Sequence, residues 1–390
     1  MSVAVSRDQE FLDAVARIAT EVAAPSADDV DREARFPVET VTALREAQAL
    51  SAFAPAELGG GGVSFEAIAS ACFELGRRCG ASAMVFAMHQ IQVATIARHL
   101  DGAPWFEDYL RDVCSEQRLI ASVTSEVGTG GDMGRSIAAL EPVGAERAQF
   151  EKQAPTVSYG AYADDLFTTM RRAPEAEPGD QVCVLSKRGQ HELEQVGSWD
   201  PLGMRGTCSP GNVVRAELPI EQVLPTAFAA VMNESMVPVS HILWSHLWLG
   251  IATDAFDRAR AFVRAAAKRK PGEPLPIAIR LSQLMSQLSL LRAEVSSGLE
   301  AFVAVSGGDR SELSQMSTIL RFNNLKIAAS EQAPLVCAGA LGVCGIVGFK
   351  NDTPFSVGRH LRDTMSACLM VANERIHETN ASLLLIAKEV

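Results

Sequence analysis

Hydrophobic residues recur with a helical period over both ends of the chain. Apolar side chains three and four positions apart follow residues 8–24, and a second stripe begins at Pro37. Residues 64–100 divide near Cys79–Gly80 into two such segments, and the second is apolar on most sides. After Pro225 the period returns in long segments: 240–263, 277–302, 315–338 and 361–389. These stripes predict helices, and a helix that is apolar all round is expected to be buried.

The middle of the chain has a different pattern of apolar and polar residues. From Leu119 to Pro225 the helical stripe gives way to alternating apolar and polar residues, interrupted by proline and glycine. This pattern is typical of short strands. The predicted strands are Ile120–Ser125, Thr156–Tyr159, Leu166–Met170, Gln181–Ser186 and Asn212–Leu218. The order of elements predicts a mostly α-helical chain with an inserted β-domain: an N-terminal α-helical domain (1–118), a central β-domain (119–227) and a C-terminal helical bundle (228–390).

Composition narrows the range of functions. With 390 residues, 47% of them hydrophobic, the chain can form two or three domains with substantial cores. Its net charge of −12 disfavours nucleic acids and anionic membrane surfaces as partners. The eight cysteines form no CxxC pair and the seven histidines are not grouped beside them, so no metal site is predicted.

The compartment is expected to be the cytoplasm. Scattered thiols suit a reducing environment better than a disulfide framework does. Arg7, Asp8 and Glu10 stand where a signal peptide needs its apolar segment. No run of about 18 apolar residues occurs, so no membrane-spanning helix is expected.

Two segments of the predicted β-domain carry hydroxyl groups, with glycines between them. Ser122–Asp132 alternates apolar and hydroxyl residues and runs into a glycine-rich turn, and Lys152–Asp164 has Thr156 and Ser158 two positions apart. Residues two apart on a strand face the same side. Hydroxyls and backbone N–H groups in this arrangement can line a flat polar ring such as a flavin. An ordinary β-hairpin with surface Ser and Thr residues is the alternative interpretation.

Three motifs resemble those of the acyl-CoA dehydrogenase family. Ser125–Asp132, which reads Ser-Glu-Val-Gly-Thr-Gly-Gly-Asp, is similar to the family's Thr-Glu-Pro-x-x-Gly-Ser-Asp. Trp199–Ser209 resembles Trp-x-x-x-Gly-x-Arg-Gly-Thr-x-Ser, and Arg359–Asp363 resembles Arg-x-x-Arg-Asp. The motifs occur in the family's order and spacing, so the resemblance covers essentially the whole chain.

The resemblance implies a fold, a cofactor and a reaction. The fold is that of the acyl-CoA dehydrogenases, with a central β-barrel-like domain and a C-terminal four-helix bundle. The cofactor is FAD, and the reaction is α,β-dehydrogenation of an acyl thioester with hydride transfer to flavin N5. The implied partners are acyl-CoA or an acyl-carrier thioester, an electron-transfer flavoprotein as acceptor, and further subunits in a homo-oligomer (dimer or tetramer), in fatty acid metabolism.

The resemblance also assigns cofactor-binding residues. Ser125 contacts the isoalloxazine, and Ser158 donates toward N5. Thr156 stands where many members have a tryptophan that shields the flavin. Arg269 and Gly345 resemble groups that reach the cofactor of a neighbouring subunit. The full set is Val123, Thr124, Ser125, Gly130, Gly131, Thr156, Ser158, Arg269 and Gly345.

The family's catalytic base is missing from both of its usual positions. One branch has a glutamate where this chain has Val371, and another has it where this chain has Ser240. A valine or an unassisted serine cannot remove a proton at neutral pH. Val371 still offers a backbone N–H to a thioester carbonyl. Glu374, one helical turn further, and His241, next to Ser240, are the candidate substitutes.

The substrate pocket is expected to include residues from the buried helix that follows Gly80. By the resemblance it takes in Met88, His89 and Gln92, together with Ser240 and Val371. For His89 and Gln92, a satisfied polar pair in the core is the alternative.

Three hypotheses for the function stay open. The first is an acyl-CoA dehydrogenase with a displaced base, which the Arg-Gly-Thr-x-Ser and Arg-Asp segments favour. The second is a non-catalytic, base-less subunit of a heteromeric dehydrogenase that works with a second family member. The third is a flavin-dependent oxygenase or oxidase on the same fold, which needs no α-proton base.

Overall fold

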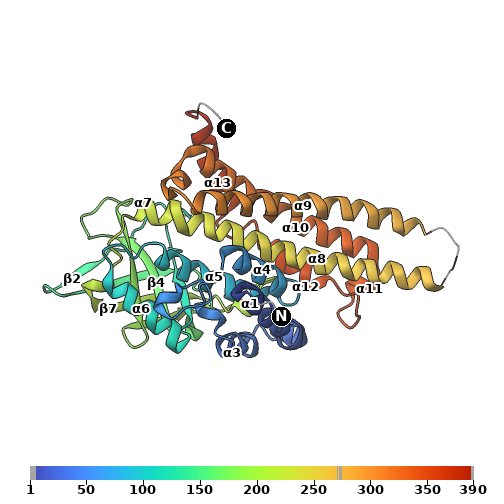
Figure 1. Ribbon diagram of the computed structural model, residues 1–390, viewed down its shortest axis with the longest axis horizontal. Coiled ribbons are helices and arrows are strands. Elements are labelled where there is room, and N and C mark those ends of the chain that lie inside the picture. The colour runs from blue at the N-terminus through green and yellow to red at the C-terminus, as the bar shows by residue number, and fades with distance from the viewer. Residues whose placement is uncertain (1–5, 270, 272–274, 388–390) are drawn as a thin grey trace, which may run out of the picture.

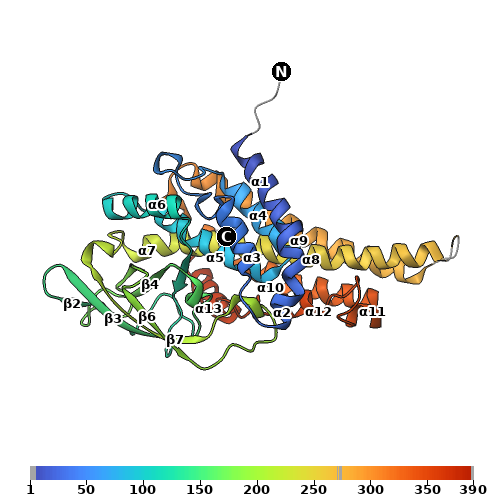
Figure 2. The same cartoon turned by 90° about the horizontal axis from the view of Figure 1, so that it is seen from below.

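The computed structural model describes residues 6–269, 271 and 275–387. Figure 1 shows a group of N-terminal helices, a β region beside them, and long helices that extend well beyond both. Figure 2, seen from below, shows the β region at the end of the molecule opposite the tip of the long helices.

The N-terminal helices follow the predicted stripes closely. α1 (Arg7–Ile18) starts at Ser6, whose Oγ accepts from the Gln9 N–H at 3.2 Å, and it continues through a π-helical turn into α2 (Ala24–Arg32). α5 is buried on nearly every side, as its sequence predicted. The remaining helices of this part are α3 (Val38–Glu46), α4 (Phe65–Gly76), α5 (Gly80–Ala97) and α6 (Pro104–Glu116).

The β region contains two sheets. One has the order β1-β4-β5, with β1 (Ile120–Val123) parallel to β4 (Asp165–Arg171) and β5 (Gln181–Lys187) antiparallel to β4. The other is antiparallel with the order β2-β3-β7-β6. Its strands are β2 (Glu141–Val143), β3 (Arg147–Ala154), β6 (His191–Val196) and β7 (Gly211–Pro219).

One predicted strand is wrong. Thr156–Tyr159 is not a strand but the loop and turn that follow β3, and Tyr159 has a φ of 44°. The pattern missed β3 because its buried face, which consists of Ala148, Phe150, Lys152 and Ala154, includes a lysine, a residue type that predicts a solvent-facing position.

Long helices make up the C-terminal part. α7 (Phe228–Val231) leads through a π-helical turn into α8 (Val237–Arg269), and α9 (Pro276–Ser306) and α10 (Met316–Cys344) pack along α8. α8 also crosses α4 closely at a pair of glycines. A Cβ on Gly250 would lie 2.3 Å from the Phe73 carbonyl oxygen, and one on Gly76 would lie 2.5 Å from that of Leu247.

The helical region predicted over 361–389 is divided by a turn. α11 (Ile346–Phe349) and α12 (Gly358–Met365) precede a turn over residues 366–372, and α13 (Asn373–Leu384) follows it. Residues 388–390 lie outside the described part of the chain. α10 is long and apolar enough to cross a bilayer by length and composition, and 50% of its most apolar window is buried inside the protein.

The last motif ties the parts together. Arg359 pairs with Asp28 at 3.0 Å, and Arg362 pairs with Asp31. Asp363 accepts a hydrogen bond from the Met204 N–H at 2.7 Å. Burial raises the pKa of the Asp363 carboxyl to about 6. These contacts join α12 to α2 and to the segment that follows β6.

The predicted fold class is confirmed: the chain is mostly helical, with a β region between the N-terminal helices and a C-terminal helical domain. All strands lie between residues 120 and 219 in the described part of the chain. The domain boundaries at 118 and 227 stay predictions.

Candidate active site

A cavity of about 670 Å³ lies where the β region meets α5, α8 and the turn 366–372. Its wall is mainly apolar and contains two tryptophans, Trp199 and Trp244. Methionine side chains are flexible and polarisable, so they adapt to irregular ligands. Those in the wall are Met84, Met88, Met133, Met204, Met236, Met365 and Met370.

Hydroxyl groups from the two segments singled out in the sequence meet in this cavity. The Ser125 hydroxyl donates to the Thr156 carbonyl at 2.7 Å, and the Thr156 hydroxyl lies 3.3 Å from that of Ser125. Ser209 donates to the Ser158 hydroxyl at 2.9 Å, which leaves the Ser158 proton free for another acceptor. Ser125, Thr156, Ser158 and Ser209 all line the cavity, and so does Thr124.

The buried side chain of Lys152 supports the C-terminal end of β1. The Lys152 ammonium, 1% exposed, donates to the carbonyls of Thr169 at 2.6 Å and Val123 at 3.3 Å, and lies 3.7 Å from Glu126. Burial lowers the pKa of Lys152 to about 8, and the Glu126 carboxylate opposes that shift. Glu126 in turn accepts from the backbone N–H of Ala138 at 2.5 Å. Lys152 and Glu126 therefore hold residues 123–125 in place through hydrogen bonds and an interaction between opposite charges.

Val371 has an unusual backbone conformation in the cavity wall. Its φ of 48° is rare for a β-branched residue. The Lys326 ammonium, fully buried, donates to the Val371 carbonyl at 2.9 Å and to the Asn373 side chain at 2.6 Å. Burial lowers the pKa of Lys326 to about 8. The contact fixes the turn 366–372 against α10, and no feature of the sequence pattern had indicated it.

The two substitute bases proposed from the sequence lie outside the cavity lining. Glu374 is exposed in the first turn of α13. His241 is buried, its Nδ1 lies 3.2 Å from the Phe322 carbonyl, and burial lowers its pKa to about 3. Neither residue is part of the cavity lining, so the catalytic roles of both stay predictions.

The polar residues of α5 divide between core and cavity. His89 Nε2 lies 2.8 Å from the Leu50 carbonyl, and its Nδ1 accepts from the Ile120 N–H at 3.1 Å. This is the satisfied core histidine of the alternative interpretation, and it is not part of the lining. Met88, Gln92, Ser240 and Val371 do line the cavity.

The remaining cofactor candidates lie in two places. Gly130 and Gly131, at positive φ, form the turn beside the cavity, and the Arg375 guanidinium donates to the Gly130 carbonyl at 3.0 Å. Arg269 ends α8, whose 33 residues span about 50 Å, and Gly345 follows α10 toward the same end of the molecule. These last two lie far from Ser125 and Ser158 within one chain.

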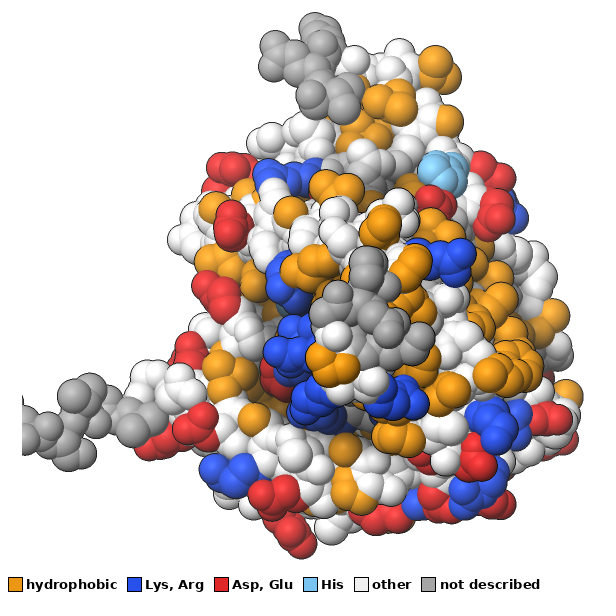
Figure 3. All heavy atoms as spheres, turned by 90° about the vertical axis from the view of Figure 1, so that its right-hand side faces the viewer, with side chains coloured by type: hydrophobic (Ala, Val, Ile, Leu, Met, Phe, Trp, Pro, Cys, Tyr) orange, Lys and Arg blue, Asp and Glu red, His pale blue; other side chains and the backbone are white. Residues whose placement is uncertain are grey.

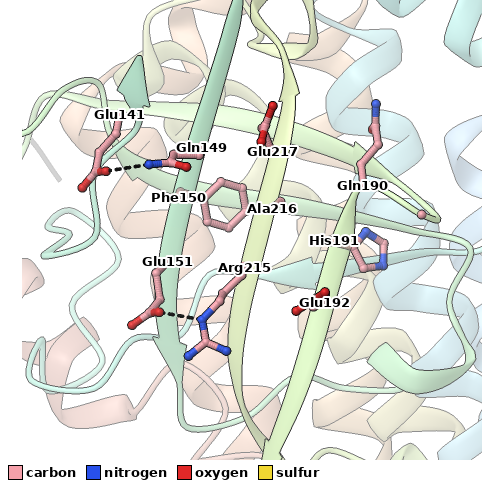
Figure 4. Close-up of a pocket in the computed structure, with 11 residues that line it drawn as sticks. Glu141, Gln149, Phe150, Glu151, Gln190, His191, Glu192, Arg215, Ala216 and Glu217 are labelled. Carbon is pink, nitrogen blue, oxygen red and sulfur yellow. Dashed lines mark hydrogen bonds and ion pairs between the residues drawn. The ribbon is translucent and has the colours of Figure 1, made fainter. Parts of the chain in front are cut away.

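A second hollow lies on the outer face of the four-stranded sheet (Figure 4). Several of its charged and polar side chains come from neighbouring strands and form ion pairs or hydrogen bonds across the sheet. Arg215 contacts Glu151 at 2.6 Å and Glu194 at 2.7 Å, and Gln149 donates to Glu141 at 3.2 Å. A solvated ladder of this kind explains the charges without a ligand.

Comparison with known proteins gives a family and a set of relatives. Residues 6–117 match the model of the acyl-CoA dehydrogenase N-terminal domain. The amino sugar nitrososynthase DnmZ of Streptomyces peucetius is 24% identical over 377 residues, 93% of this chain and 89% of that protein.

Two solved structures illustrate the range of proteins with this fold. KijD3, in complex with FMN and dTDP-3-amino-2,3,6-trideoxy-4-keto-3-methyl-D-glucose, superposes with a TM-score of 0.84 at 22% identity, covering 99% of this chain and 96% of KijD3. Butyryl-CoA dehydrogenase from Megasphaera elsdenii superposes with a TM-score of 0.80 at 17% identity, covering 99% of this chain and all of that one. Residues 6–117 therefore carry the N-terminal domain of the acyl-CoA dehydrogenase family, and the chain has the acyl-CoA dehydrogenase fold along its length.

Proposed function

We propose that the chain is a flavin-dependent monooxygenase acting on a mainly apolar substrate that carries a polar group such as an amine. The observation that carries this proposal is the cavity wall, which includes Val371 and Ser240, the two residues that the resemblance places at the family's glutamate positions. A dehydrogenase must remove an α-proton, whereas a monooxygenase needs no such base. The similarity to an amino sugar nitrososynthase over most of the chain supports an amine as the oxidised group.

One carboxylate does belong to the described lining. Asp132 lies in the glycine turn, and its Oδ1 accepts from the Gly134 N–H at 2.9 Å. That bond explains Asp132 as the residue that shapes the turn, through an Asx-type contact.

The residues present fit a flavin. Ser125, Thr156 and Ser158 give the cavity a polar edge, and an added Cβ on Gly131 would meet nothing within 4 Å, so there is room beside the turn. FAD fits the family, and FMN is the flavin in the KijD3 complex. A bound flavin, reduced beforehand by an external two-electron donor, would supply the electrons and the oxygen activation that no side chain can.

The chain's own residues orient the reactants and exclude water. Because Ser209 donates its proton to the Ser158 hydroxyl, the Ser158 proton stays available for a hydrogen bond to the polar edge of the flavin ring. Thr156, in place of a shielding tryptophan, leaves space for dioxygen. The methionine-rich wall around Met88 and Met370 would exclude water from the bound substrate.

We also propose that the chain forms a homo-oligomer. Exposed large apolar side chains on the long helices, among them Ile279, Leu290 and Leu335, support this. Figure 3 shows hydrophobic and basic side chains gathered around the end of these helices, with acidic ones mostly toward the edge. In such an assembly Arg269 and Gly345 would serve a partner subunit's cofactor.

The second candidate is the α,β-dehydrogenation of an acyl thioester, with an electron-transfer flavoprotein as acceptor. The apolar cavity favours it, because an acyl chain would fit between Met88 and Met370. It requires a base: Glu374 after a movement of α13, Asp132, or a residue supplied by a second family member. The last case corresponds to a base-less subunit in a heteromeric dehydrogenase.

One set of measurements separates the two candidates. The protein is loaded with FMN or FAD, chemically reduced and mixed with a panel of aminated substrates under ¹⁸O₂. We expect one ¹⁸O atom in the product and the other in water. Under anaerobic conditions we expect a panel of acyl-CoA thioesters to leave the oxidised flavin spectrum unchanged. Bleaching by an acyl-CoA with formation of its enoyl product would overturn the monooxygenase proposal, and loss of that bleaching in Asp132→Asn would identify the base.

A further inference from the structure

Two segments that are distant in the sequence form facing parts of the cavity wall. One is the glycine turn, residues 128–132, and the other is the turn 366–372, which leads into α13. Gly131 lines the cavity from the first segment and Leu369 from the second, and both residues are exposed. The cavity therefore reaches the surface beside these two segments.

A buried carboxylate closes the base of the glycine turn. Glu126, which precedes the turn, accepts hydrogen bonds from the Ser136 hydroxyl at 2.6 Å and from the Ile137 N–H at 3.1 Å. Its side chain is buried. The two ends of the segment are therefore held together, which is the geometry of a compact surface loop.

The glycine turn makes few hydrogen bonds to the rest of the chain. Among the described residues, its hydrogen bonds stay within the turn and the residues beside it, with one exception. The Asp132 N–H donates to the Thr129 carbonyl at 3.2 Å, and the Thr129 hydroxyl donates to the Glu126 carbonyl at 3.1 Å. Gly130 and Gly131 have positive φ values, and glycine can change its backbone conformation there at little steric cost.

The exception is a hydrogen bond between the two sides of the cavity. Arg375 of α13 donates from Nε to the Gly130 carbonyl at 3.0 Å, across 245 positions of the sequence. Glu378 lies 2.8 Å from Nη1 of the same guanidinium and orients it. An added Cβ on Gly130 would lie 2.6 Å from Arg375 Nη2, so the turn and the arginine are in close contact.

α13 is the fixed side of this contact. Its Asn380 accepts a hydrogen bond from Asn323 of α10 at 2.7 Å, and its Asn373 accepts one from Lys326 at 2.6 Å. All four of these side chains are buried. The exposed glycine turn has no comparable anchor, so we expect the turn and not the helix to move when the bond to Arg375 breaks.

We propose that the glycine turn is a gate to the cavity and that Arg375 is its latch. While Arg375 binds the Gly130 carbonyl, the turn is held against α13 and narrows the opening. When the bond breaks, the turn moves about its closed base, and a ligand enters or leaves. The inference goes beyond the proposed function, because it holds for any ligand of this cavity.

The test measures access to the cavity with no flavin or substrate added. Met88→Cys places a thiol in the lining, and N-ethylmaleimide labels it at a rate that depends on how often the gate is open. Peptide mass spectrometry follows each cysteine separately. Adding Arg375→Gln should raise the labelling rate at position 88 about fivefold, the factor that corresponds to one hydrogen bond. Cys208, a half-buried native thiol outside the lining, should keep its rate.

A second variant breaks the latch from the other side. Gly130→Ala places a methyl group against the Arg375 guanidinium and should raise the rate by a similar factor. Combined with Arg375→Gln it should add little, because both changes break the same bond. Gly144→Ala is the matched control, since Gly144 also has a positive φ, of 71°, and an added Cβ there meets nothing within 4 Å.

Three results would overturn the proposal. The first is an unchanged labelling rate at position 88 in Arg375→Gln. The second is an equal rise at Cys208, which would indicate a general loosening of the chain. The third is a double variant of Arg375→Gln and Gly130→Ala in which the two effects multiply in full, because the two residues would then not share one contact.

Discussion

The Ser125 hydroxyl donates to the carbonyl of Thr156 at 2.7 Å, across 31 positions of the sequence. This contact joins the end of β1 to the loop after β3, and both residues line the cavity. It sets the spacing between the two hydroxyl segments on which flavin binding is proposed to depend.

We therefore expect Ser125→Ala to weaken flavin binding about tenfold, the equivalent of one lost hydrogen bond together with a less ordered loop. Flavin fluorescence titration measures the dissociation constant. Ser115→Ala, at an exposed site on α6, is the matched control and should leave it unchanged. An unaltered flavin affinity in Ser125→Ala would argue against a flavin at this edge.

Removing the buried cation behind β1 should destabilise the protein. Lys152→Met leaves the Glu126 carboxylate buried with its opposite charge gone, and breaking such a pair costs about 3 kcal/mol. Urea unfolding measures the loss. Adding Glu126→Gln should recover part of it, because no uncompensated charge then remains. Lys350→Met, at an exposed position, is the control. A fully additive double variant would show that the two groups do not interact.

The contact between Lys326 and Val371 should control the order of the turn 366–372. Lys326→Met leaves the Val371 carbonyl without this donor and removes the shorter of two hydrogen bonds to the Asn373 side-chain oxygen, at a cost of about 1–3 kcal/mol. Hydrogen exchange should rise in that turn and stay unchanged in α5. Lys268→Met, on the exposed end of α8, is the control.

Val371→Gly tests whether that lysine holds a strained backbone. Glycine adopts a φ of 48° without the steric cost, which is about 1 kcal/mol or more for a β-branched residue. The stability lost in Lys326→Met should therefore be smaller when Val371→Gly is already present. Equal losses in the two backgrounds would mean that the lysine does not hold this conformation.

Buried histidines should make the protein less stable in acid. Burial lowers the pKa of His89 and of His246 to about 4, below the unfolded value near 6.5. The unfolded state then binds more protons, so each histidine contributes stability that is present above about pH 6.5 and is lost as the pH falls toward 4. Asp363, with its raised pKa, acts in the opposite sense between about pH 6 and 4.

Unfolding free energies at pH 7 and pH 5 measure this effect. Each histidine should account for about 1–2 kcal/mol of the difference. His246→Gln should flatten the pH dependence, whereas His377→Gln, at an exposed position, should not. An equally steep dependence in His246→Gln would contradict the assignment.

The sequence by itself determined the layout of the fold. The helical period found most helices of both ends, and alternation found β1, β4, β5 and β7, because a repeating apolar face reports which side of an element is buried. It also pointed to Ser125, Thr156 and Ser158, which the fold brings into one cavity, although it assigned the latter two to a strand that does not form.

Only the tertiary structure decided how the site is supported. Lys152 lies on the buried face of β3, and Lys326 lies within α10. The sequence pattern does not indicate which buried group either lysine contacts. Lys326 meets the Val371 carbonyl across 45 positions. Met88 and Ser240 line one cavity only because α5 and α8 pack together. A periodic pattern records the burial of one face of an element, whereas a hydrogen bond between distant segments depends on where the packed elements place individual atoms.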